Sequence, residues 1–208
     1  MSYIPSPFRV SDEPTLLEFM RTYDFATIVS HSPDGLVASH VPVLVRRSGP
    51  ALLIVGHLAR ANPHWRLMDG KTPTLAIFHG PQGYVSPTWY ATAPAVPTWH
   101  YGVVHAHGLP IAHEDEPFVR GVLDELVQRY EGHRPDGWRP ESVPADFYAG
   151  LLRAIVGFTL PATRLEGKFK LGQTRSVEDR RRTIAGLEQA GSPEATWLAE
   201  FMRRRAGV

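Results

Sequence analysis

The chain has 208 residues, a formal net charge of +1, 43% hydrophobic and 21% charged residues, and no cysteine. The absence of cysteine excludes disulfides, a thiolate nucleophile and cysteine-ligated zinc, and the near-neutral charge gives no general electrostatic reason to bind nucleic acid or a membrane surface. The chain does not open on a basic segment followed by an apolar run, and no apolar run reaches the roughly 18–20 residues that cross a bilayer, so we expect a soluble cytoplasmic protein with no membrane contact.

The first sixty residues have the pattern of a helix followed by a β-meander. Ser11 is the expected N-cap of an amphipathic helix that ends near Tyr23. The strands expected after it lie at residues 25–31, 36–46 and 51–57. The Asp-Gly pair between the first two strands favours a tight hairpin turn. Pro42 interrupts the second strand and marks an edge or a bulge, which would leave backbone groups near Ser39–Pro42 free.

A polar loop follows the third strand. Arg60 and Asn62 lie in it, and Pro63 opens a short helix toward Met68. The N–H groups at a helix N-terminus attract anions, and Arg60 could add a bidentate contact to a phosphate. The alternative is that Asn62 only caps the helix and that Arg60 is solvated.

The stretch Tyr84–Tyr101 contains Pro-Thr-Trp twice and is rich in aromatic residues. We expect a strand at residues 74–79 and a turn at Gly80–Gly83 before it, and a long strand over Val96–Gly108. Its prolines prevent a continuous helix, and its Trp and Tyr side chains offer flat apolar faces with one polar tip. The stretch could line a planar ligand or a subunit interface, or it could be the core of an irregular barrel corner.

Two histidines of the long strand, His105 and His107, share one face and could ligate a metal. No third ligand is visible nearby in the sequence, so we predict no metal site. The chain shows neither a nucleophile triad nor a pair of carboxylates with a catalytic pattern, so the catalytic residues stay unassigned.

The C-terminal half alternates between helices and one strand. The expected helices span residues 114–131, 144–153, 176–187 and 192–205, and the expected strand spans residues 155–165. Ser176 and Asp179 have the spacing of a capping box. The excess of basic residues after Lys168 could form a DNA-binding tail, although cations also suit helix C-termini on a solvated surface.

Several phrases of the chain together resemble one family, and they occur in the family's order over nearly the whole length. The phrases are GHLARANPHW (56–65), GPQGYVSPTWY (80–90), VPTWHY (96–101), IVGF (155–158) and GKFKLGQTRSVEDR (167–180). They resemble the PaiB-type proteins, which are described as FMN-binding negative transcriptional regulators. The resemblance implies a mainly β fold with flanking helices (α+β), an FMN-binding split β-barrel that forms a homodimer. We expect a split-barrel domain at residues 1–175 with inserted helices at about 114–153, and a C-terminal helical extension at residues 176–208.

The resemblance also implies where FMN is bound, at the subunit interface. In the related superfamily the second barrel strand lays its backbone along the flavin, and the following strand-to-helix loop holds the phosphate. The positions that match the strand are Ser39, His40, Val41 and Pro42, and those that match the loop are His57, Ala59, Arg60 and Asn62. The expected lining residues are Trp99, His100 and Tyr101. The late basic segment, with Lys168, Lys170 and Gln173, could bind an anionic ligand or the partner's FMN, or could form salt bridges between subunits. In this family Asn is commoner at the position of His100, which could therefore hydrogen-bond the ring, act as a catalytic candidate by titrating near neutral pH, or face the barrel wall.

Three functions are open at this point. The first is flavin redox chemistry or ligand sensing, which would make the chain an FMN-dependent oxidoreductase or a flavin-based sensor of a small molecule. The second is a transcriptional regulator that binds DNA or a partner protein, although the sequence shows no clear helix-turn-helix. The third and least favoured is haem binding or degradation, since the chain has ten histidines but none after His133.

Overall fold

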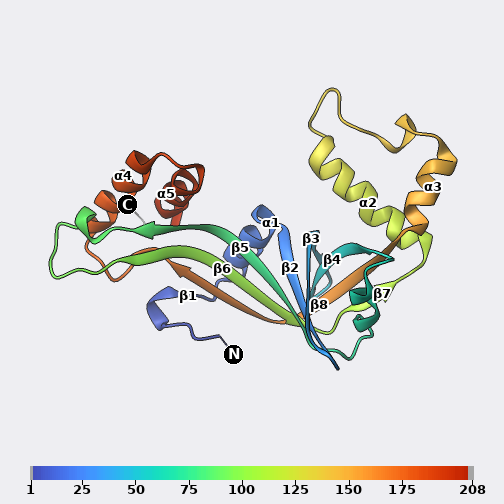
Figure 1. Ribbon diagram of the computed structural model, residues 1–208, viewed down its shortest axis with the longest axis horizontal. Coiled ribbons are helices and arrows are strands. Elements are labelled where there is room, and N and C mark those ends of the chain that lie inside the picture. Colours follow the sequence, from blue (N-terminus) through green and yellow to red (C-terminus); the bar gives the residue numbers. More distant parts are fainter. Residues whose placement is uncertain (1, 206–208) are drawn as a thin grey trace. The chain divides into compact units, whose positions relative to one another are not determined.

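The computed structural model describes residues 2–205, which form an antiparallel sheet with flanking helices (Figure 1). Its strands are β1 (Arg9–Val10), β2 (Phe25–Ser32), β3 (Gly35–Ser48), β4 (Ala51–Ala59), β5 (Thr74–Val85), β6 (Thr98–Gly108), β7 (Ile111–His113) and β8 (Ile155–Lys170). Its α-helices are α1 (Glu13–Thr22), α2 (Glu116–Glu131), α3 (Ala145–Arg153), α4 (Val177–Ala190) and α5 (Pro193–Arg205). Four short 3₁₀ helices complete the fold, namely η1 (Ser6–Phe8), η2 (Pro63–Leu67), η3 (Pro87–Trp89) and η4 (Pro140–Ser142).

The strands follow the order β1-β8-β4-β3-β2-β5-β6, with β7 beside β8 and an additional β8–β6 pairing that closes the path. The chain divides into two compact units. The first unit consists of residues 1–19, 78–105 and 166–208, and the second consists of residues 20–77 and 106–165. No helix among the described residues is both long and apolar enough to cross a membrane.

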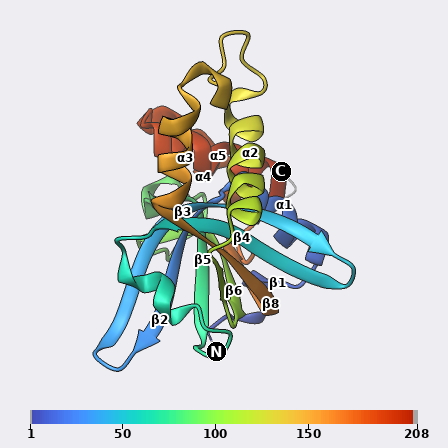
Figure 2. The ribbon, with the colours of Figure 1, turned by 90° about the vertical axis from the view of Figure 1, so that its right-hand side faces the viewer.

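The second unit contains the β-meander and the helix pair α2 and α3, which lie side by side (Figure 2). Helix α2 begins at the predicted place because the Asp115 carboxylate accepts a hydrogen bond from the Phe118 N–H at 2.9 Å. Its Val122 and Leu126 pack on Leu44 of β3 and Val55 of β4. The apolar periodicity of this helix therefore matches a face that is buried against the sheet.

The first unit contains a core of three aromatic rings. Phe19 of α1, Phe169 of β8 and Phe201 of α5 have ring centroids 4.9 to 5.8 Å apart. Gly102 of β6 lies beneath them, since a Cβ at this position would come within 2.8 Å of the rings of both Phe19 and Phe201. Helices α4 and α5 lie side by side in the same unit (Figure 1).

Three expectations from the sequence are corrected by the structure. The first helix is capped by Asp12, whose carboxylate accepts the Thr15 N–H at 3.0 Å, and not by Ser11. The turn expected at Gly80–Gly83 is wrong, because β5 continues to Val85 and Gly83 gives the close approach that Leu198 needs. The helix expected after Pro63 is a five-residue 3₁₀ helix, too short to build up the dipole of an anion-binding N-terminus.

The remaining helices and strands lie within a few residues of their expected places, except that β8 extends to Lys170 and so includes the first part of the basic segment. Residues 206–208 of the expected C-terminal extension lie outside the described residues. The boundary at residue 175 stays a prediction.

Candidate functional site

In the second unit, strands β3 and β4 part halfway along their length. Their ladder runs from the Ser48–Ala51 pair to the Val43–Gly56 pair, and it ends there in the described part of the chain. Residues 36–42 of β3 continue in a ladder with β2, and residues 57–59 of β4 continue in a ladder with β8. The segments 39–42 and 57–59, both expected to contact FMN, therefore flank the opening, where each strand has a backbone edge that its own ladder does not use.

Side chains alternate across this part of β3. Ser39 and Val41 are buried, whereas His40 is exposed and Pro42 is half-buried. The alternation follows from the two-residue period of a strand. The four residues therefore lie in a row beside the opening but do not share a side-chain surface.

The Ser39 hydroxyl is engaged by the polar turn that follows β4. It lies 2.8 Å from His64 Nδ1, and Asn62 Nδ2 donates to it at 3.0 Å. His64 Nε2 lies 2.9 Å from the Ser30 hydroxyl, so both ring nitrogens of this imidazole have partners. Burial lowers the pKa of His64, which is 1% exposed.

His64 is absent from the residues expected at the site. A histidine directly after the first proline of a short helix carries no local signal of burial, and its partners come from strands that lie earlier in the chain. Asn62 caps η2, as one reading of the sequence proposed, because its side chain accepts the His64 N–H at 3.1 Å.

Arg60 is engaged by protein groups, although its side chain is still 38% exposed. Its Nε donates to the Arg153 carbonyl at 2.9 Å, its Nη2 donates to the Ile155 carbonyl at 3.3 Å, and its Nη1 pairs with the Glu114 carboxylate at 2.5 Å. The guanidinium has five N–H groups and these contacts use three of them, so a phosphate contact at Arg60 stays a prediction, as does one at Asn62. Ala59, directly before it, is exposed at the end of β4.

His57 is a half-buried residue of β4 with an unsatisfied polar atom. Its Nδ1 is buried and has no hydrogen-bond partner among the described residues, and burial lowers its pKa. Its cross-strand neighbour is Gly157, and Phe118 lies where a side chain on that glycine would be, because a Cβ there would be 2.7 Å from the ring. A neutral imidazole beside the parted strands therefore has a nitrogen that a ligand could satisfy.

The other expected lining residues belong to the first unit. Trp99 is 54% exposed and stands edge-on to Tyr84, with ring centroids 6.5 Å apart. Lys168 Nζ lies 5.5 Å from the centroid of the Tyr101 ring, a cation–π contact. Lys170 Nζ donates to the Thr98 hydroxyl at 2.5 Å. Trp99, Tyr101, Lys168 and Lys170 thus combine aromatic faces with positive charge, which suits a planar anionic ligand.

His100 lies on the opposite side of β6 from Trp99 and Tyr101. It is 2% exposed and packs against Gly172, where a Cβ would be 3.1 Å from its Cε1. Burial, with the charges of Lys170 and Arg175, lowers the pKa of His100 to about 4. The imidazole is therefore neutral at physiological pH, and of its three expected roles the geometry supports the one in which it faces the wall of the sheet.

Gln173 is engaged within its own turn. Its Oε1 accepts the Leu171 N–H at 2.8 Å, and its Nε2 donates to the Phe169 carbonyl at 2.5 Å. Both ends of the amide therefore hold the loop between β8 and α4. A contact between Gln173 and FMN stays a prediction that this geometry does not favour.

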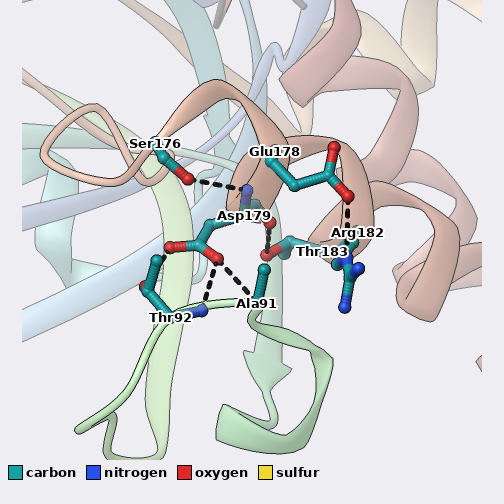
Figure 3. Close-up of polar contacts among 7 residues, drawn as sticks. All are labelled: Ala91, Thr92, Ser176, Glu178, Asp179, Arg182 and Thr183. Atoms are coloured by element: carbon teal, nitrogen blue, oxygen red, sulfur yellow. Dashed lines mark hydrogen bonds and ion pairs between the residues drawn. The ribbon is translucent and has the colours of Figure 1, made fainter.

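Asp179 fixes the middle of the aromatic stretch to helix α4 (Figure 3). Its carboxylate accepts the Ala91 N–H at 2.7 Å, the Thr92 N–H at 3.2 Å and the Thr92 hydroxyl at 2.5 Å. These hydrogen bonds, that of the Thr92 hydroxyl first, lower the pKa of Asp179. Ser176 caps the helix as expected, at 3.0 Å from the Asp179 N–H, but the Asp179 carboxylate binds the loop and does not complete the capping box.

Trp89, the other tryptophan of the repeated Pro-Thr-Trp motif, packs on helix α4. A Cβ at Gly186 would lie 2.4 Å from its ring. The indole is thus part of the packing between η3 and α4, and Trp99 alone of the two tryptophans is largely exposed.

The arginines at the end of α5 have carboxylate partners. Arg203 pairs with Glu188, Arg205 pairs with Glu18 at 2.5 Å, and Arg204 lies 4.0 Å from Glu200. These ion pairs match the interpretation in which the basic residues are cations suited to a helix C-terminus. They weaken the interpretation of this segment as a DNA-binding tail.

Parted neighbouring strands in a closed antiparallel path, with a polar turn beside the opening, define a split β-barrel, and solved structures bear this out. The flavocytochrome Anf3 from Azotobacter vinelandii superposes with a TM-score of 0.61 and 15% identity, over 84% of this chain and 75% of that one. The FAD and heme binding protein from Mycobacterium smegmatis superposes with a TM-score of 0.60 and 18% identity, over 88% of this chain and 80% of that one. These likenesses confirm the expected fold class.

The particular family follows from two further matches. The chain belongs to the family described as "Putative FMN-binding domain", whose model matches residues 2–164. It is also 30% identical over 200 residues to the "Protease synthase and sporulation protein PAI 2" of Bacillus subtilis (strain 168), with 96% of each chain covered. The expected PaiB-type family and its cofactor, FMN, are thereby confirmed.

Proposed function

We propose that the chain holds FMN along the parted edges of β3 and β4, as a homodimer, and uses it in redox chemistry or in sensing a small-molecule ligand. The parting of the two strands after the Val43–Gly56 pair carries the proposal, because it leaves two facing backbone edges without a ladder between them. Backbone N–H and C=O groups are obligatory hydrogen-bonding groups, and the polar edge of a planar ring could satisfy them.

The residues beside the opening fit FMN. The backbone groups of residues 39–42 and 57–59 that their own ladders leave free would orient the ring, with Pro42 contributing only a C=O. The unpartnered His57 Nδ1 would meet a polar atom of the ligand, and the Asn62 amide would donate to a further oxygen. Because burial keeps His57 and His64 neutral, neither histidine adds a charge to the site. FMN would supply the redox chemistry itself.

A second copy of the chain would cover the exposed aromatic and basic surface of the first unit. Tyr84 and Trp99 are both about half exposed, and aromatic side chains with one polar tip are enriched at protein interfaces. Sedimentation of the purified protein should give a dimer. A monomer at micromolar concentration would contradict this part of the proposal.

The visible spectrum of the purified full chain, with and without added FMN, tests the cofactor. We expect a flavin spectrum that gel filtration does not remove and that dithionite bleaches. A protein that stays colourless after incubation with FMN would overturn the proposal. Titration with haemin belongs in the same experiment, because one of the similar structures is that of an FAD and heme binding protein. A Soret band without a flavin spectrum would favour haem binding instead.

A second candidate is a regulator of gene expression, favoured by the name of the Bacillus relative, a protease synthase and sporulation protein. In this reading the flavin or another ligand would change binding to DNA or a partner protein. Gel shifts at physiological salt test it, because electrostatic binding without sequence preference is suppressed there. Absence of any sequence preference would count against direct DNA contact.

A further inference from the structure

Buried polar side chains form one continuous chain of hydrogen bonds through the second unit, from Thr74 to His64. The Thr74 hydroxyl lies 3.3 Å from the Thr72 carbonyl and donates to it. Since a hydroxyl has one hydrogen, Thr74 must accept at its other contact, 2.7 Å from the Ser30 hydroxyl. Ser30 therefore donates to Thr74 and must accept from His64 Nε2 at 2.9 Å.

The same reasoning extends through the imidazole to the opening between β3 and β4. A neutral histidine has one N–H and one acceptor nitrogen, so His64 with its hydrogen on Nε2 accepts at Nδ1. The Ser39 hydroxyl, 2.8 Å away, therefore donates to Nδ1, and its oxygen accepts from Asn62 Nδ2 at 3.0 Å. All donors along the chain point the same way, from Asn62 toward Thr72.

The orientation of the Asn62 amide is fixed at both ends. Its Oδ1 accepts the backbone N–H of His64 at 3.1 Å, while its Nδ2 donates to Ser39. A flipped amide would set Nδ2 against that N–H and Oδ1 against a hydroxyl whose hydrogen is already used. Asn62 is half-buried, and Nδ2 has a second hydrogen that this chain of bonds does not use.

We propose that His64 is a positioning residue, which fixes Asn62 through Ser39 as a hydrogen-bond donor toward the bound ligand. The ligand atom that meets Asn62 is then an acceptor, an oxygen of the phosphate or of the flavin ring carbonyls, and a ligand with a donor at this place is rejected. The inference rests on the proposed FMN site. It also assigns the Ser39 side chain to the support of the site, so that any direct ligand contact of this residue is made by its backbone.

The first test is the tautomer of His64 in the full chain without FMN, read from the ¹⁵N shifts of the imidazole at neutral pH. We expect a neutral ring with its proton on Nε2. A proton on Nδ1, or on both nitrogens, would overturn the inference, whatever the protein does with FMN.

The second test breaks the chain of bonds away from the ligand. Ser30→Ala removes the acceptor of the His64 Nε2–H. Ser32→Ala, on the same strand, serves as the matched control, because its hydroxyl donates to the Gly35 carbonyl and takes no part in this chain of bonds. In a fluorescence titration with FMN we expect Ser30→Ala to weaken binding about fivefold, the size of one lost hydrogen bond, and to shift the tautomer. Ser32→Ala should change neither quantity. If the Ser30→Ala variant stays folded and binds FMN as tightly as the wild type, the positioning role of His64 is overturned.

The third test uses Asn62→Asp, which has nearly the same shape, keeps an acceptor for the His64 N–H and has no N–H to offer the ligand. We expect about tenfold weaker FMN binding or more, since a carboxylate would face an acceptor. If the acceptor is the phosphate, riboflavin binding should change much less than FMN binding, and if it is a ring carbonyl, both should weaken equally. Unchanged FMN binding by Asn62→Asp would overturn the donor role.

The proposed function and this inference fail in different ways. If the wild type binds no FMN, the proposed function falls, and the ligand half of the inference falls with it. The direction of the buried hydrogen bonds is still decided by the ¹⁵N measurement. If the wild type binds FMN and the His64 ring has the other tautomer, the inference alone is overturned.

Discussion

At the scale of single residues, the buried imidazole of His100 makes the stability of the protein depend on pH. Its pKa in the folded protein is about 4, below the ordinary 6.5. As the pH falls below 6.5 the unfolded chain takes up a proton here, whereas the folded protein does so only near pH 4. Stability that is present above pH 6.5 is therefore lost as the pH falls, by up to about 3 kcal/mol. Urea unfolding measures the free energy of unfolding at pH 7.5 and at pH 4.5. Between these two pH values, that free energy should fall less for His100→Gln than for the wild type.

His79→Gln is the matched control, because His79 is an exposed histidine of the same unit. The other buried histidines remain in both variants, so the difference between them isolates His100. Equal acid sensitivity of His100→Gln and His79→Gln would contradict the assignment.

His100 also shows where prediction from sequence reached its limit. The period of two along a strand places Trp99 and Tyr101 on one face and the residue between them on the other. The resemblance to a family assigned all three residues to the flavin, although the strand period alone separates His100 from its neighbours. His64 could not be found in this way, because its partners Ser30 and Ser39 become its neighbours only through the sheet.

At the scale of elements, two helical glycines should respond in opposite directions to the same substitution. Gly186 of α4 lies under Trp89, so a Cβ there would be 2.4 Å from the ring, whereas a Cβ at Gly121 of α2 would meet nothing within 4 Å. We expect Gly186→Ala to lower the free energy of unfolding by about 1–3 kcal/mol through overpacking. Gly121→Ala should raise it by about 0.5–1 kcal/mol, because alanine favours the helix.

Urea unfolding of the two variants beside the wild type measures both changes. A neutral or stabilising Gly186→Ala would show that the contact between η3 and α4 is looser than described. The near-UV circular dichroism of Gly186→Ala should change as well, because the substitution displaces an indole ring.

The elements themselves were predictable where their signals are local. The cap at Ser176, the tight hairpin between β2 and β3 and the apolar period of α2 all act within a few residues. The expected turn at Gly80–Gly83 failed because proline and glycine usually mark turns, while the reason for Gly83, the side chain of Leu198, lies far along the chain. The use of Asp179 to hold Ala91 and Thr92 was invisible for the same reason.

At the scale of the whole molecule, the parting of β3 and β4 was only partly foreseen. Pro42 suggested free backbone groups near Ser39–Pro42, but the opening depends on where the two ladders of β3 end. The ladder with β4 ends at the Val43–Gly56 pair, and the ladder with β2 ends at the Phe25–Pro42 pair. Ladder ends follow from long-range pairing, which one sequence does not specify. The resemblance to a family filled this gap, because it pointed to the same two segments that the structure brings to the opening.

Binding of FMN should raise the stability of the chain unevenly, because every residue placed beside the opening, from Ser39 to Asn62, belongs to the second unit. A ligand at 100 times its Kd stabilises the state that binds it by about 2.7 kcal/mol, which for a chain of this size raises the Tm by roughly 5–10 °C. Hydrogen exchange with and without FMN should show the largest gain in protection in β3, β4 and η2. AMP, which has a phosphate but no flavin ring, is the control and should leave the Tm unchanged. Equal protection of helices α4 and α5 would contradict a site confined to the second unit and would point instead to contacts that a bound partner subunit provides.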